Sequence, residues 1–94
     1  MVPYDTVEEY TRKQAPYVEH VRIRRTDDEQ YPSGWDYTLH YGTTNGETLL
    51  RYDNAHEQTK GHERHTGDDV SEIEFPGMAT LLARFQREVD ELPP

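Results

Sequence analysis

The segment from residue 51 to residue 66, RYDNAHEQTKGHERHT, gathers most of the side chains that could do chemistry. It holds three of the five histidines, together with arginine, aspartate and asparagine. Cleavage of RNA without a metal needs a general base for the 2′-hydroxyl, a general acid for the leaving 5′-oxygen and cations for the developing phosphate charge. Histidine suits both proton transfers near neutral pH. The segment therefore predicts metal-independent RNA cleavage that needs no cofactor.

Three residues of this segment are predicted to be catalytic. His62 and His65 lie three positions apart, so they would project together if the segment turned helically, and they form the expected acid–base pair. Asp53 would orient one of these histidines. Four further residues are predicted to bind substrate: Arg51 and Arg64 as a bidentate phosphate clamp, Asn54 to hold the loop or touch a base, and His40.

Two other interpretations of the same residues stay open. His56, His62 and His65, with Asp53 as an oxygen ligand, supply a plausible zinc site, and a position left to water would suit a metal-dependent hydrolase. Alternatively, the segment is a solvated loop without a function, in which Asp53 and Asn54 only end a strand through an Asx-type turn.

The elements that position these residues are predicted from apolar periodicity. Residues 17–25 and 35–41 alternate apolar and polar side chains, which indicates strands with one core face. Asn45-Gly46 is a preferred type I′ hairpin turn before a return strand at residues 47–53. That turn predicts four cross-strand pairs, Tyr41–Leu50, Leu39–Tyr52, His40–Arg51 and Thr38–Asp53.

The rest of the chain is predicted to complete a small α+β fold. Residues 54–69 lack an apolar period and are expected to be a polar loop, followed by a fourth strand at 70–75. Pro76 is suited to the first turn of a helix that runs to residue 92 and carries an apolar stripe. A short helix is expected at residues 5–14.

The fold class is therefore α+β, a four-stranded antiparallel β-meander with one C-terminal helix packed on one face. We expect a single domain over residues 1–94, with an N-terminal segment 1–16, a sheet region 17–75 and a helix 76–92. The opposite sheet face would stay polar and open. An exposed edge of the hairpin and the strand at 17–25 could both pair across a homodimer.

Composition excludes several classes of protein. The chain has 94 residues, 32% of them hydrophobic, and a net charge of −9, so we expect no transmembrane span, no signal peptide and a cytoplasmic location. The absence of cysteine excludes disulfides and thiolate chemistry. The acidic balance argues against general DNA coating and, with Thr frequent and large aliphatics sparse, is typical of adaptation to a salt-rich cytoplasm.

The run RYDNAH, followed by H-x-x-H, a short acidic strand and a C-terminal helix, resembles the TumE-type toxins of toxin–antitoxin pairs. The resemblance covers roughly residues 17–92, and the composition resembles a haloarchaeal member. Six residues carry the resemblance: Arg51, Tyr52, Asp53, Asn54, His62 and His65. One departure is the stretch EQTKG between His56 and His62, which lengthens the linker.

The resemblance implies a small α+β toxin held in check by a helix-turn-helix antitoxin. RNA is then the expected substrate on the strength of the residue types above. A non-catalytic alternative in the same family is a binding or regulatory protein, whose histidine- and arginine-rich segment would recognise a partner or a nucleotide.

Overall fold

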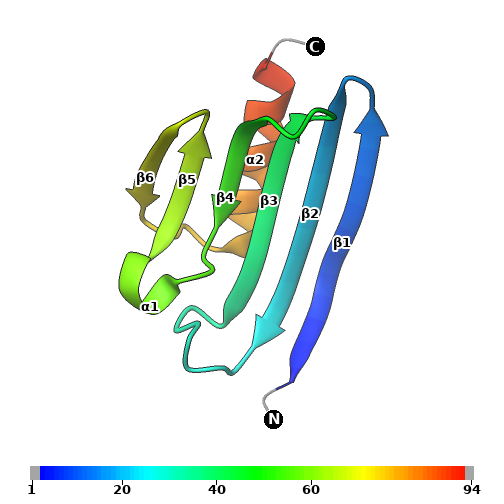
Figure 1. Ribbon diagram of the computed structural model, residues 1–94. Helices are drawn as coiled ribbons and strands as arrows, with labels where there is room; N and C mark the ends of the chain where they lie inside the picture. The colour runs from blue at the N-terminus through cyan, green and yellow to red at the C-terminus, as the bar shows by residue number, and fades with distance from the viewer. Residues whose placement is uncertain (1–2, 93–94) are drawn as a thin grey trace.

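A computed structural model describes residues 3–92 as one antiparallel sheet with a helix across one face (Figure 1). The sheet order follows the chain, from β1 to β6. The elements are β1 (Tyr4–Gln14), β2 (Tyr17–Thr26), β3 (Trp35–Thr43), β4 (Thr48–Asp53), α1 (Glu57–Lys60), β5 (His62–Thr66), β6 (Asp69–Ile73) and α2 (Met78–Glu91). No described element covers the other face of the sheet, which we call the open face.

The core lies between α2 and the inner face of the sheet. Alternating residues of the central strands point to α2, and α2 presents residues spaced three and four apart, as an amphipathic helix requires. The buried apolar residues are Val21, Ile23, Tyr37, Leu39, Leu50, Tyr52, Met78, Leu81 and Phe85. The predicted C-terminal helix and aromatic core face are therefore confirmed.

The predicted register between β3 and β4 is also confirmed, although the turn differs. All four predicted pairs are present. The loop contains three residues, 44–46, because the amide of Thr43 donates to the carbonyl oxygen of Glu47, and among these three only Gly46 has a positive φ, 90°. A type I′ turn would need a second positive φ. A bulge at Leu49, which has no partner on β3, restores the predicted register.

Gly42 is required by this bulged hairpin. A Cβ atom at Gly42 would lie 2.4 Å from the backbone oxygen of Glu47. We expect Gly42→Ala to lower the free energy of unfolding by about 1–3 kcal/mol, because the hairpin backbone must shift. Urea unfolding measures the change, and Thr44→Ala on the exposed loop is the control. Equal stability of the two variants would contradict the close approach.

The N-terminal helix predicted at residues 5–14 is wrong, because these residues form β1. β1 pairs antiparallel with β2 from Tyr4 to Gln14, so its backbone hydrogen bonds go to a neighbouring strand rather than to a helical turn. The β-branched and aromatic residues Thr6, Val7, Tyr10 and Thr11 favour a strand. β1 also covers the strand edge that was expected to pair across a dimer, so the sheet edges are β1 and β6.

The polar loop predicted at residues 54–69 is wrong as well. It contains α1, β5 and the start of β6, the strand predicted at 70–75. With β1 and β5 added to the four predicted strands, the sheet has six strands rather than four. β5 has no apolar pattern that would predict a strand, because its residues, HERHT, are polar on both faces. It forms because the free edge of β4 pairs with its backbone. This correction decides where the histidines point.

Candidate functional site

His62 and His65 lie on opposite faces of β5, so the predicted acid–base pair is not brought together. Side chains alternate along a strand, and residues three apart must face opposite ways. The cross-strand pairs show which face each takes, because Tyr52 of the core is opposite Arg64 while Arg51 is opposite His65. Hence His62 shares the helix side with Arg64, and His65 shares the open face with Arg51.

His62 belongs to the packing of the core edge. Its Nδ1 atom lies 2.7 Å from the hydroxyl of Tyr37, and its ring stacks on Phe75 at 4.5 Å between centroids. Its Nε2 atom lies 3.3 Å from the Glu57 carboxylate. Burial lowers the pKa of His62, and the Glu57 charge opposes this only partly. The ring is therefore a partly buried packing group whose surroundings favour the neutral form.

Asn54, which was predicted to bind substrate, is buried completely and is held by other residues of the chain. Its Oδ1 accepts a hydrogen bond from the amide of Tyr37 at 3.1 Å. Its Nδ2 donates to the carbonyl oxygen of Trp35 at 2.6 Å and to the Glu57 carboxylate at 2.7 Å. Glu57 in turn accepts two hydrogen bonds from Ser33. Asn54 therefore ties β3, β4 and α1 together.

Arg64 lies on the helix side, so the predicted phosphate clamp of Arg51 and Arg64 is not formed. Its Nη2 donates to Glu88 of α2 at 2.5 Å, and its Nε donates to the Tyr52 hydroxyl at 3.0 Å. The hydrogen bond to Glu88 raises the pKa of Arg64. Arg64 thus fastens β5 to α2.

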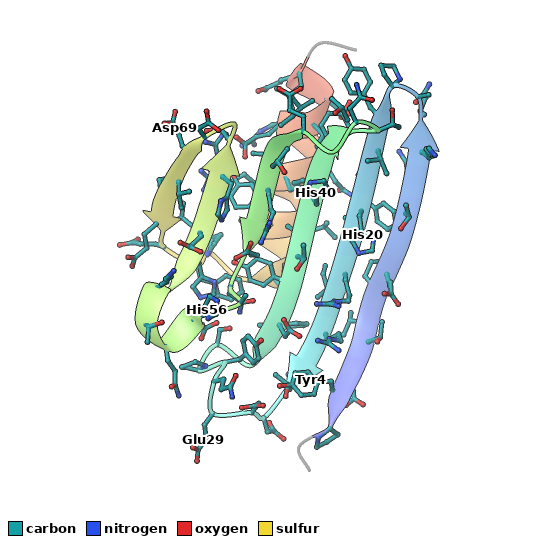
Figure 2. All side chains as sticks on the ribbon, viewed as in Figure 1. Tyr4, His20, Glu29, His40, His56 and Asp69 are labelled. Atoms are coloured by element: carbon teal, nitrogen blue, oxygen red, sulfur yellow. The ribbon has the colours of Figure 1, made fainter. Side chains whose placement is uncertain are left out.

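On the open face, a row of four residues crosses four strands. His20 of β2 is opposite His40 of β3, His40 is opposite Arg51 of β4, and Arg51 is opposite His65 of β5. We call these four residues the histidine row. His20 and His40 can be followed side by side in Figure 2. His20 was not among the site residues predicted from the sequence. The alternation of residues 17–25 does place it on the polar face of its strand, and this signal could have identified it.

Asp53 holds the arginine of this row. The Arg51 Nε donates to Asp53 Oδ2 at 2.6 Å, and Asp53 is only 3% exposed. The Nε2 atom of His65 lies 3.7 Å from the same Asp53 oxygen. Burial, and next the nearby Arg51 and His20, lower the pKa of His40. The row thus combines a fixed guanidinium with two flanking imidazoles, one of which favours its neutral form.

The zinc ligands predicted at His56, His62 and His65 do not converge. His62 and His65 face opposite ways, and His56 is exposed at the start of α1. Within residues 3–92, the side chains that come close enough to share a cation are Asp53, Glu63 and His65. Glu63 was missed because its segment was taken for a loop; the alternation of HERHT places it beside His65.

A comparison with protein families shows to which family the chain belongs. The family model described as toxin TumE matches residues 2–93, essentially the whole chain. The chain belongs to the TumE toxin family. No curated protein sequence and no solved structure matches it significantly. The predicted resemblance is therefore confirmed, and it extends over β1 as well.

Membership of the TumE family identifies the chain as a toxin component of a toxin–antitoxin system, and a toxin of this kind implies an antitoxin partner. Within the described residues, no helix combines the length and apolar character needed to cross a membrane.

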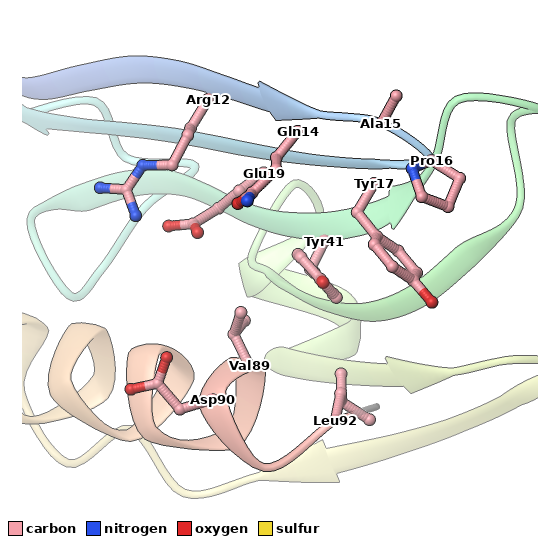
Figure 3. Close-up of a pocket in the computed structure, with 10 residues that line it drawn as sticks. All are labelled: Arg12, Gln14, Ala15, Pro16, Tyr17, Glu19, Tyr41, Val89, Asp90 and Leu92. Atoms are coloured by element: carbon pink, nitrogen blue, oxygen red, sulfur yellow. The ribbon is translucent and has the colours of Figure 1, made fainter. Parts of the chain in front are cut away.

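A hollow of about 370 Å³ lies elsewhere, between the turn joining β1 and β2 and the end of α2 (Figure 3). Its wall includes Arg12, Tyr17, Glu19, Tyr41, Val89 and Leu92. The rings of Tyr17 and Tyr41 stack at 5.7 Å. None of the residues lining it belongs to the histidine row, so it is not the candidate site.

The two histidines with lowered pKa values predict a pH-dependent stability. His40 and His62 bind fewer protons in the folded state than in the unfolded chain, whose histidine pKa is about 6.5. Their stabilisation is complete above that value and is lost as the pH falls toward their folded-state pKa values. We expect the urea concentration at the unfolding midpoint to decrease as the pH is lowered from about 7.5 to about 5.5. Ordinary carboxylates titrate below this pH range, so they do not contribute.

Single variants test this assignment. His40→Gln and His62→Gln should each flatten the dependence of the unfolding midpoint on pH. If both variants kept the slope of the wild-type protein, neither histidine would be the source of the effect.

Proposed function

We propose that this TumE toxin cleaves RNA on the open face, without a metal, at the part of the histidine row formed by His40, Arg51 and His65. The observation that carries the proposal is the register, which sets two imidazoles on either side of one guanidinium. Proton donor, proton acceptor and phosphate-binding cation are the three groups that this reaction needs.

The spacing supports a phosphate bound between the histidines. Adjacent strands lie about 4.8 Å apart, so the backbones of His40 and His65 are about 10 Å apart, with Arg51 between them. If Arg51 binds the phosphate, the neighbouring ribose 2′-hydroxyl would lie toward one imidazole ring and the leaving 5′-oxygen toward the other. Arg51 is 42% exposed in its side chain, so it can reach a ligand while Asp53 holds it.

The roles follow from the surroundings of each ring. His40, whose pKa is lowered, would take the proton from the 2′-hydroxyl as that oxygen attacks the phosphorus. His65, beside two carboxylates, would donate a proton to the leaving 5′-oxygen. The products are a 2′,3′-cyclic phosphate and a free 5′-hydroxyl. Arg51 would stabilise the charge on the phosphorane, and Asp53 is the positioning carboxylate.

The proposed function also includes a location and a partner for the toxin. The toxin would act in the cytoplasm, where RNA and a helix-turn-helix antitoxin are available, and the antitoxin would hold it inactive. His62, Asn54 and Arg64 support the sheet rather than the reaction. The acidic composition still predicts a salt-rich environment for the protein. Activity should therefore be measured in concentrated potassium chloride.

The decisive experiment incubates the folded protein with a labelled structured RNA, with and without a chelator. We expect cleavage in both tubes, and a single 2′-deoxynucleotide at the cleaved position should abolish it, because the attacking oxygen is then missing. Cleavage that disappears on chelation would favour a metal-dependent hydrolase. An intact RNA in both tubes would favour the non-catalytic binding function.

A further inference from the structure

The Nε2 atom of His65 is in an unusual position between two carboxylates. It is shielded from solvent and makes no hydrogen bond to any residue in the range 3–92. Asp53 Oδ2 lies 3.7 Å away and Glu63 Oε1 lies 3.8 Å away. Both distances are beyond a hydrogen bond, whose range ends near about 3.2 Å for nitrogen and oxygen. A direct hydrogen bond therefore does not explain the arrangement.

The same distances suit three ligands of one cation. Zinc binds imidazole nitrogen and carboxylate oxygen at about 2.1 Å, which puts tetrahedral ligands about 3.4 Å apart. The distances from His65 to the two carboxylates exceed this by a few tenths of an ångström, within the reach of side-chain rotation. All three donor atoms lie within 4.8 Å of one another.

The strands hold these donors in place. Asp53 and Glu63 are directly opposite each other on β4 and β5, and His65 follows Glu63 two residues later on the same face. Asp53 is already anchored through Arg51. Arg51 contacts Asp53 Oδ2 through both Nε and Nη2, at 2.6 Å each. A carboxylate has about four acceptor positions on its two oxygens, so Asp53 can keep Arg51 on Oδ2 and offer Oδ1 to a cation.

The local charge also favours a cation. Asp53 and Glu63 carry two negative charges, and Arg51 balances one of them. Glu72 of β6 lies directly opposite Glu63, so a further negative charge is close by. Like charges directly opposite on a sheet are destabilising, and a divalent cation would relieve this repulsion.

From these observations we propose that Asp53, Glu63 and His65 form a binding site for a divalent transition-metal cation of the zinc type. The imidazole ligand favours zinc over magnesium or calcium. A consequence rests on the proposed function: a cation on the Nε2 of His65 would take the place of the proton on that nitrogen, and the ring left without the imidazolium charge is a poor proton donor, so the cation would inhibit RNA cleavage.

The test of the site is a zinc titration of the folded full-length protein, with a chromophoric chelator as competitor. Potassium nitrate replaces the chloride salt, because chloride binds zinc. We expect one equivalent to bind per chain, and His65→Gln and Glu63→Gln should each weaken binding by more than about tenfold. His56→Gln, at an exposed histidine outside the site, is the matched control and should bind as the wild-type protein does.

Two results would overturn the cation site: the absence of stoichiometric binding by the folded wild-type protein, or binding that survives both His65→Gln and Glu63→Gln. Circular dichroism and the unfolding midpoint show that each variant is folded.

RNA cleavage with and without added zinc gives a separate readout. Inhibition by one equivalent of zinc, reversed by chelator, supports the regulatory consequence. Activation by zinc would keep the site and overturn the metal-free mechanism. If the protein did not cleave RNA at all, the proposed function would fail, whereas the titration would still decide the cation site.

Discussion

Replacing His65 by glutamine should slow RNA cleavage by about 10²–10⁴-fold, because this is the usual contribution of a positioned general acid. Glutamine keeps a polar group of similar reach but cannot donate a proton to the leaving oxygen. His40→Gln should cause a loss of similar size by removing the general base. Initial rates on the labelled RNA, measured in chelator, check both expectations.

The pH profile separates a catalytic role from a structural one. The wild-type rate should be bell-shaped in pH, and each variant should lose the limb of the histidine that it lacks. His56→Gln, outside the histidine row, should keep the wild-type rate and profile. If His65→Gln kept the full rate, or if His62→Gln abolished cleavage in a folded protein while His65→Gln did not, the assignment to the open face would be wrong.

The largest effect on stability is expected at Asn54. Asn54→Ala removes three hydrogen bonds and leaves the Tyr37 amide, the Trp35 carbonyl and the Glu57 carboxylate each short of a partner. A buried polar group left unsatisfied costs about 1–3 kcal/mol, so we expect the free energy of unfolding to fall by about 3 kcal/mol or more. Urea unfolding at constant pH and salt measures the loss.

Asn45→Ala is the matched control, because Asn45 is exposed in the hairpin loop between β3 and β4. It should change stability by less than about 0.5 kcal/mol. A folded Asn54→Ala protein of wild-type stability that had lost RNA binding would instead restore the substrate-binding role first predicted for this residue.

Apolar periodicity in the sequence was enough to predict the central strands and the helix. Trp35, Tyr37, Leu39 and Tyr41 alternate with polar residues, so only one register buries them, and the pairs with β4 follow even though the turn type does not. The helix stripe from Met78 to Val89 is just as unambiguous. Two residues of the proposed site, His40 and Arg51, were correctly placed opposite each other for this reason.

Polar segments carry no such signal. β1 is exposed along most of its length and β5 is polar on both faces, so neither contains an apolar period that would identify a strand. Each is a strand because a neighbouring strand offers a free edge to its backbone. Whether His62 and His65 act together depends entirely on this, since a helical turn would join them and a strand separates them.

The chain by itself thus determined the apolar core, the C-terminal helix, the β3–β4 register and the residue types on which the proposal of RNA cleavage is based. Only the tertiary structure decided which of those residues share a face. The physical reason is that burial of apolar side chains is encoded locally by periodicity, whereas the direction of a polar side chain depends on which backbone pairs with its own.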